Sequence, residues 1–292
     1  MMDQTSPHTS EAQLLRKSYR CTALDEEREY FLYLPAGYEA DPERLWPVML
    51  FLHGGGERGD GRADLDWVLH NGPLGEAWIY RHDLPFIIIG PQLPVFDKDH
   101  QIELRKDAVK PARQLEGVPP RRAVERAGFP MVRGGSPRPP RFGSLDAWGV
   151  EGAPGGWQNC EADLLTMVDA TLSEYRADPA RVYLTGLSYG GYGTWYMATA
   201  HPQRWAAIAP MCGGGNPALA ARLADVQMPV WIFHGGRDEV VAPKYSYEMA
   251  NALEEAGHQS VRLTIHEDLP HNCWDRVYAG EDLYNWLLQF HL

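Results

Sequence analysis

The sequence predicts an α/β fold with a mostly parallel central sheet that is covered by helices on both faces. Short apolar runs typical of buried parallel strands recur along the chain, helical patterns separate them, and Gly or Pro signals mark the turns between them. The chain has 292 residues, of which 44% are hydrophobic and 23% are charged. This length and composition suit one large domain, so we expect residues 1–292 to form a single domain.

The N-terminal third contributes three expected strands. Residues up to about Arg20 look like a polar tail or an edge segment, and residues 29–34 then form a strand of aromatic and aliphatic side chains. Residues 47–52 are an unbroken apolar run, as expected of a strand buried on both faces. Residues 85–89 form the next buried strand and end at Gly90-Pro91.

The composition changes between residues 94 and 156. This window holds 9 of the chain's 23 prolines, and residues 98–141 carry 11 Lys and Arg against 5 Asp and Glu. No sustained helical or alternating period fits it, so it has no means of building a core of its own. We interpret 94–156 as a long proline-rich insertion, either a lid over the active site or a surface loop.

Regular order resumes at Glu161, where strands and helices alternate to the end of the chain. A helix is expected at 161–176, because Leu164, Val168 and Leu172 lie on one helical face. Pro243 and Gly257 are placed to open and close another helix. The remaining expected elements are the strands 181–187, 205–210, 229–233 and 261–265 and the helices 192–200, 217–223 and 282–290.

A Gly-x-Ser-x-Gly motif lies where the strand at 181–187 meets the next helix. A serine on such a tight turn takes a strained backbone, so its neighbours must lack side chains, as Gly186, Gly190 and Gly191 do. This is the nucleophile elbow of the α/β-hydrolase fold, which predicts Ser188 as the nucleophile.

A serine hydroxyl needs a base, and the base needs an acid that orients it. In this fold the partners follow in the order Ser, Asp or Glu, His, each after a strand. Asp238 follows the strand at 229–233, with Glu239 as the weaker alternative, and His271 follows the last strand. We therefore predict Ser188, Asp238 and His271 as the catalytic residues. We expect His53 and His234 to hold loop backbone.

The oxyanion site is predicted from backbone N–H groups. One belongs to Tyr189, the residue after the nucleophile, and the other to Gly55 in the glycine turn after residue 52, with Gly56 as the alternative. That turn also satisfies Gly-x-Gly-x-x-Gly, but the next strand ends without the acid that a dinucleotide site needs. His266 and His271 lack the spacing of a helical zinc motif, so no metal site is predicted.

The formal charge of −12 argues against a nucleic-acid-binding protein. No stretch is long and apolar enough to span a membrane, and residues 1–20 contain no signal-like apolar run. Four widely spaced cysteines, Cys21, Cys160, Cys212 and Cys273, are expected to be free thiols in a cytoplasmic protein. A mature exported form would give the same sequence, and the oligomeric state is not predicted.

Several longer motifs occur together in this chain. They are 33–38, 47–59, 178–195, Pro210-Met-Cys-Gly-Gly-Gly215 and His271-Asn-Cys-Trp274. Together they resemble the serine esterases of the polyhydroxybutyrate depolymerase and feruloyl esterase type, including the bacterial group called predicted peptidases. The resemblance covers 30–92 and 157–288 and implies ester hydrolysis through an acyl-serine, with no cofactor. It also implies the triad Ser188, Asp238 and His271 and an oxyanion loop formed by the glycines after His53.

From these observations we expect a serine carboxylesterase that acts on small ester substrates, such as feruloyl, acetyl or other short-acyl esters. Trp157, Tyr189 and Trp274 are candidates for the wall of the substrate pocket, with core packing as the alternative for each. A serine peptidase of the same fold and a non-catalytic binding module on a hydrolase scaffold are the two other functions to be weighed.

Overall fold

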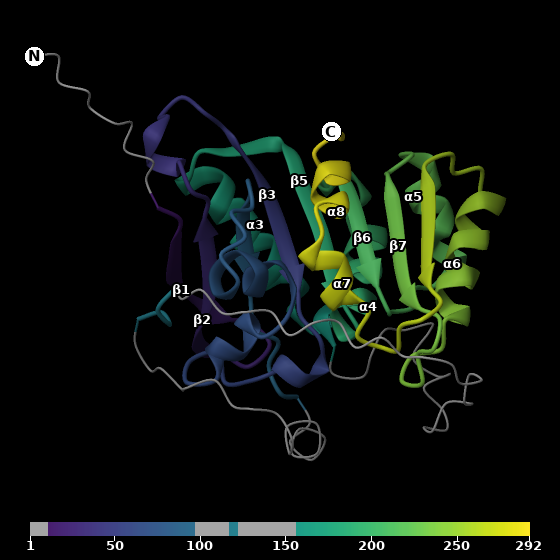
Figure 1. Cartoon of the computed structure of the whole chain (residues 1–292), viewed down its shortest axis with the longest axis horizontal. Coiled ribbons are helices and arrows are strands. Elements are labelled where there is room, and N and C mark those ends of the chain that lie inside the picture. Colours follow the sequence, from purple (N-terminus) through teal and green to yellow (C-terminus); the bar gives the residue numbers. More distant parts are fainter. Residues whose placement is uncertain (1–10, 97–116, 122–155) are drawn as a thin grey trace, which may run out of the picture.

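The computed structural model describes residues 11–96, 117–121 and 156–292 (Figure 1). Most of the predicted insertion at 94–156 lies outside these residues. Its interpretation as a lid or a surface loop, and the division of the chain into one domain with an insertion, therefore stay predictions.

The centre of the fold is an eight-stranded sheet with the order β1-β2-β4-β3-β5-β6-β7-β8 (Figure 1). β1 and β2 are antiparallel to each other and β2 is antiparallel to β4, whereas all other neighbours are parallel. The predicted mostly parallel sheet is confirmed. The strands are β1 Gln13–Cys21, β2 Glu26–Leu34, β3 Trp46–Leu52, β4 Ile87–Gly90, β5 Ala177–Leu187, β6 Ala207–Met211, β7 Val230–Gly235 and β8 Val261–His266.

Helices cover both faces of the sheet, as predicted. α3, α4, α5 and α6 pack on one face, and α1, α7 and α8 pack on the other. The helices in the described residues are α1 Gly72–Leu74, α3 Glu161–Glu174, α4 Tyr189–Ala200, α5 Ala220–Asp225, α6 Lys244–Glu255, α7 Trp274–Ala279 and α8 Asp282–Leu287, and short helical turns include Gly55–Glu57, Leu65–Leu69, Gly75–Ile79, Trp157–Cys160 and Pro217–Leu219.

β3 shows why an unbroken apolar run is required in the middle of this sheet. Val48, Leu50 and Leu52 belong to the core under α3 to α6, whereas Met49 and Phe51 belong to the core under α7 and α8. All five side chains are fully buried. Because successive residues of a strand point to opposite faces, a strand with helices on both sides has no position for a polar side chain.

The predicted ends of α6 are also observed. The helix begins directly after Pro243, and Gly257 takes a φ of +82°, the left-handed conformation that favours glycine after a helix. The His258 N–H donates to the Leu253 carbonyl at 2.9 Å, so one of the last carbonyls of α6 finds a partner.

Of the two alternatives for the residues up to about Arg20, the edge segment is confirmed for residues 13–21 and the tail is wrong there. These residues form the edge strand β1, with the polar Arg16, Ser18 and Arg20 on its partly exposed side. α7 was not predicted, since it has only six residues and begins within the motif that carries His271. The strand expected at 181–187 begins earlier, at Ala177, and its register shifts near its start, because Trp46 pairs with Ala177 but Val48 pairs with Val182.

Candidate active site

Ser188 lies in a sharp turn between β5 and α4. Its φ of +52° and ψ of −115° are unusual for a residue other than glycine, which is the strained backbone expected of a nucleophile elbow. The turn is held close to β3, because a Cβ added to Gly190 would lie only 1.7 Å from the carbonyl oxygen of Leu52. The Ser188 N–H donates to the Met211 carbonyl at 2.9 Å, which joins the elbow to the end of β6.

The structure brings the three predicted catalytic side chains together. Nε2 of His271 lies 2.9 Å from Oγ of Ser188, and Nδ1 of His271 lies 2.6 Å from Oδ2 of Asp238. An ionised carboxylate only accepts hydrogen bonds, so Nδ1 carries the proton. In the neutral imidazole Nε2 is then the nitrogen that accepts the Ser188 hydroxyl, which is the tautomer that a general base needs. It is Asp238 and not Glu239 that reaches the histidine.

Asp238 is held as an anion in a buried turn after β7. Its Oδ1 accepts the N–H groups of Val240 and Val241, each at 2.8 Å. Burial by itself would raise the pKa of Asp238, but hydrogen bonds from His234 and His271 outweigh burial and hold that pKa well below its ordinary value. The carboxylate is therefore ionised at every pH at which the protein would be assayed.

The environment of His271 favours its protonated form. Burial would lower the pKa of the imidazole, but its interactions with Asp238 and Cys212 together outweigh burial and raise the pKa to about 9. The edge-on indole of Trp274, with ring centroids 4.9 Å apart, covers one side of the imidazole. This contact fixes the plane of the ring, since Trp274 is itself 8% exposed and packed in the core under α7.

Two cysteine side chains, Cys212 and Cys273, lie close to the backbone of His271. The thiol of Cys212 donates to the carbonyl of His271 at 3.1 Å, and its Sγ lies 3.2 Å from Sγ of Cys273. Burial raises the pKa of Cys212 well above its ordinary value, so the thiol stays protonated and is able to donate. All four cysteines are buried and free, as predicted for them.

The glycine loop after β3 lies against the elbow. A Cβ added to Gly54 would lie 3.6 Å from Cβ of Ser188, and one added to Gly55 would lie 3.2 Å from the ring of Tyr189. Arg58 fastens this loop, because its Nε donates to the Gly55 carbonyl at 2.9 Å and its guanidinium lies over the Tyr189 ring at 5.0 Å. The loop thus packs beside Ser188, and the use of the Gly55 and Tyr189 N–H groups for an oxyanion stays a proposal.

The two tryptophans proposed for the pocket occupy different places. Trp157 is 1% exposed, its indole N–H donates to the His53 carbonyl at 3.1 Å, and it packs in the core under α3 to α6. These contacts favour the packing alternative for Trp157. Trp274 borders His271, and within the described residues its buried indole N–H has no hydrogen-bond partner.

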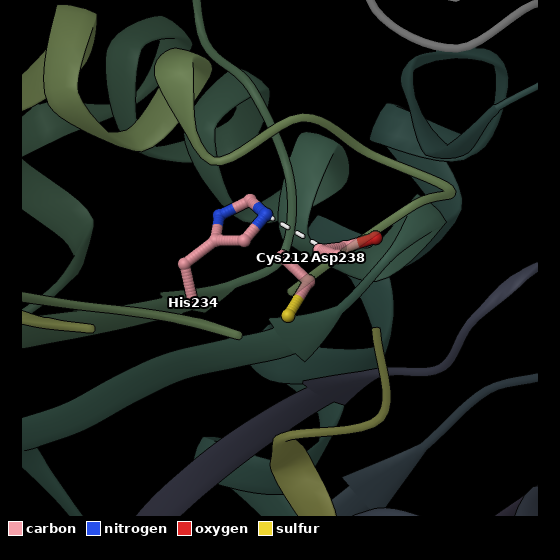
Figure 2. Close-up of side chains that lie close together, drawn as sticks. All are labelled: Cys212, His234 and Asp238. Atoms are coloured by element: carbon pink, nitrogen blue, oxygen red, sulfur yellow. Dashed lines mark ion pairs between the residues drawn. The ribbon is translucent and has the colours of Figure 1, made fainter. Parts of the chain in front are cut away.

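His53 and His234 hold loop backbone, as expected from their places at strand ends. Nε2 of His53 accepts the Leu93 N–H at 2.9 Å, and Nε2 of His234 lies 3.0 Å from the Val241 carbonyl. His234 also reaches Asp238, with 3.1 Å between Nε2 and Oδ2 (Figure 2). This contact could not be predicted, because a histidine at the end of an apolar strand has the pattern of a core residue.

One group of side chains in the described residues has donor atoms close enough to hold a metal ion. It consists of Cys212, His234 and Asp238, with their donor atoms within 4.8 Å of one another (Figure 2). Each of the three already makes the hydrogen bonds described above, and together they support His271 and its carboxylate. The predicted lack of a metal site stays a prediction.

Comparisons with known proteins identify the fold. The model of the prolyl oligopeptidase family matches residues 146–218, which include Ser188. A solved structure of a thermostable esterase superposes on 96% of this chain and 63% of its own with a TM-score of 0.62 and 24% identity. The chain has the α/β-hydrolase fold.

Two curated proteins are also similar to this α/β-hydrolase. A bifunctional acetylxylan esterase/xylanase of Neocallimastix patriciarum is 27% identical over 149 residues, which are 50% of this chain and 20% of that protein. A poly(3-hydroxyalkanoate) depolymerase C of Paucimonas lemoignei is 46% identical over 48 residues, which are 16% of this chain and 12% of that protein. The matches thus cover a fifth or less of the curated relatives. They confirm the predicted resemblance to esterases and depolymerases.

No helix in the described residues has the length and the apolar character needed to cross a membrane.

Proposed function

We propose that the protein is a serine carboxylesterase that acts on small esters through an acyl-serine. The observation that supports this most directly is the hydrogen-bonded chain from Oγ of Ser188 through His271 to Oδ2 of Asp238, with distances of 2.9 and 2.6 Å. Such a chain makes a serine hydroxyl nucleophilic by giving its proton an acceptor at the moment of attack.

The reaction would proceed in two halves. Oγ of Ser188 attacks the acyl carbon while Nε2 of His271 takes its proton, and the protonated imidazole then donates that proton to the leaving alcohol. A water molecule next attacks the acyl-serine, with His271 as base again, and the carboxylic acid leaves. In both halves Asp238 stabilises the imidazolium, and the N–H groups of Gly55 and Tyr189 would receive the negative charge on the carbonyl oxygen.

The substitution Ser188→Ala tests the proposal. We expect the rate of hydrolysis of p-nitrophenyl acetate to fall by a factor on the order of 1,000 or more and the melting temperature to stay unchanged. A fluorophosphonate probe should label the unsubstituted protein at Ser188 and leave the variant unlabelled. Undiminished hydrolysis by a folded Ser188→Ala variant would show that the mechanism is wrong, and a failure to label would favour a binding module on the same scaffold.

The match to the prolyl oligopeptidase family favours a serine peptidase as the second candidate. A peptidase uses the same three side chains but must protonate an amine as the leaving group. Turnover of an ester and an amide with the same acyl group separates the two functions. A panel of acetyl, feruloyl and longer acyl esters would then define the acyl preference.

A further inference from the structure

A second histidine contacts the proposed catalytic carboxylate. His234 is the second-last residue of β7, its side chain is fully buried, and its Nε2 lies 3.1 Å from Oδ2 of Asp238 (Figure 2). Oδ2 is also the oxygen that accepts Nδ1–H of His271 at 2.6 Å. Two imidazoles therefore share one carboxylate oxygen.

The partners of His234 fix where its proton is. Nε2 lies 3.0 Å from the carbonyl oxygen of Val241, and a carbonyl only accepts hydrogen bonds. Nε2 must therefore carry a proton, which it shares between the Val241 carbonyl and Oδ2 of Asp238. On the other side of the ring, Nδ1 lies 2.7 Å from Oγ of Ser246 on α6, and this hydroxyl is able to donate to it.

We propose that His234 is a positioning residue that donates from Nε2 to Oδ2 of Asp238 and thereby sets the basicity of His271. The inference rests on the proposed function, because it assigns His234 a part in the same triad. Val240 and Val241 hold Oδ1 through their N–H groups, so the carboxylate keeps its place without His234. What His234 adds is a second donor on the oxygen that faces His271.

The effect on His271 follows from how the charge is shared. A donor on Oδ2 takes up part of the negative charge that would otherwise stabilise protonated His271. Loss of that donor should therefore raise the pKa of His271 further and shift the acid limb of kcat/KM to higher pH. In the part of the chain that the structure describes, three other titratable groups lie at this cluster. They are Cys212, whose pKa burial raises well above its ordinary value, Cys273, whose Sγ lies 3.2 Å from that of Cys212, and Tyr192 of α4, whose pKa burial raises far above the assay range.

Two amide substitutions make a matched pair for the test. The amide nitrogen of Gln can take the place of Nε2, whereas the shorter Asn can reach only the place of Nδ1. In His234→Asn we expect the acid limb to move up by about one pH unit, the size of one hydrogen bond to a charged group. At neutral pH kcat/KM should then fall about 10-fold. His234→Gln should return the limb to within a few tenths of a unit of the unsubstituted protein.

The substitution Ser246→Ala is the control for loss of packing around the ring, since it removes the contact at Nδ1 and leaves Nε2 in place. We expect it to leave the acid limb unchanged. Melting temperatures of all three variants show whether they fold. An equal shift in His234→Asn and His234→Gln, no shift in either, or a shift to lower pH would overturn the proposal.

A measurement without turnover separates this inference from the proposed function. The imidazole of His271 can be titrated by NMR in each variant, and the pKa of His271 should rise in His234→Asn and not in His234→Gln. If Ser188→Ala keeps its esterase activity, the proposed function fails while this titration still tests the contact. If Ser188→Ala is inactive and the titration shows no difference between the variants, the inference about His234 fails alone.

Discussion

Substitution of Gly190 by alanine gives a sharp test of how the elbow is built. The added Cβ would lie 1.7 Å from the Leu52 carbonyl oxygen and 2.4 Å from its carbon, and both are backbone atoms of β3. An ordinary contact begins near 3.4 Å, so the start of α4 would have to move by 1.7 Å, the difference between 3.4 and 1.7 Å. We expect Gly190→Ala to cost about 3 kcal/mol of unfolding free energy, as severe overpacking does.

The same movement would carry Ser188 away from His271. A displacement of about 1 Å in a catalytic group costs on the order of 100-fold in rate, so kcat/KM on p-nitrophenyl acetate should fall by at least that factor. Urea unfolding followed by circular dichroism gives the stability and initial rates give the activity. Gly280→Ala is the matched control, because its Cβ would meet only ordinary contacts at 3.7 Å, and its effect should stay within about 0.5 kcal/mol. If Gly190→Ala unfolds at the same urea concentration as the unsubstituted protein, the packing argument is wrong.

Three further predictions concern the same site. The pKa of His271, raised to about 9, places the acid limb of kcat/KM above the ordinary histidine value, and Asp238→Asn should move that limb down, as a pH series of initial rates would show. By linkage, protonated His271 stabilises the fold fully below about pH 6.5 and loses this contribution as the pH rises to about 9, so thermal melts should show stability falling in that window. Cys212→Ala removes the donor to the His271 carbonyl and should cost about 1 kcal/mol in urea unfolding, whereas Cys212→Ser, which keeps a donor, should cost less; equal losses would contradict the role of that hydrogen bond.

Much of the fold could be predicted because local patterns and global packing agree. The unbroken apolar run of β3 fits a strand that is buried on both faces of the sheet. Pro243 and Gly257 mark the ends of α6 through their own backbone preferences. The three side chains now found in one hydrogen-bonded chain through His271 were predicted from the order of the residues after strands. Parallel strands place such residues at one edge of the sheet.

The rest depends on contacts that no local pattern records. β1 is a half-exposed edge strand, so its sequence is polar, and α7 is too short to show a helical period. The approach of His234 to Asp238 depends on the turn that follows β7, which folds the chain back on itself. No sequence pattern distinguishes a tryptophan in a pocket wall from one in the core. Only the 1% exposure of Trp157 and its hydrogen bond to the His53 carbonyl show the difference.

The groups proposed to act in catalysis are divided unequally along the chain. Ser188, Asp238 and His271 all come from the stretch after residue 156, whereas the glycine loop comes from the stretch before residue 97. A single cut between these stretches would leave the acid-base groups on one fragment and the Gly55 loop on the other. The two fragments would have to reassociate through the pairing of β3 with β5 before the loop could return to Ser188. Recovery of turnover after mixing would therefore report directly on the formation of that central strand pair.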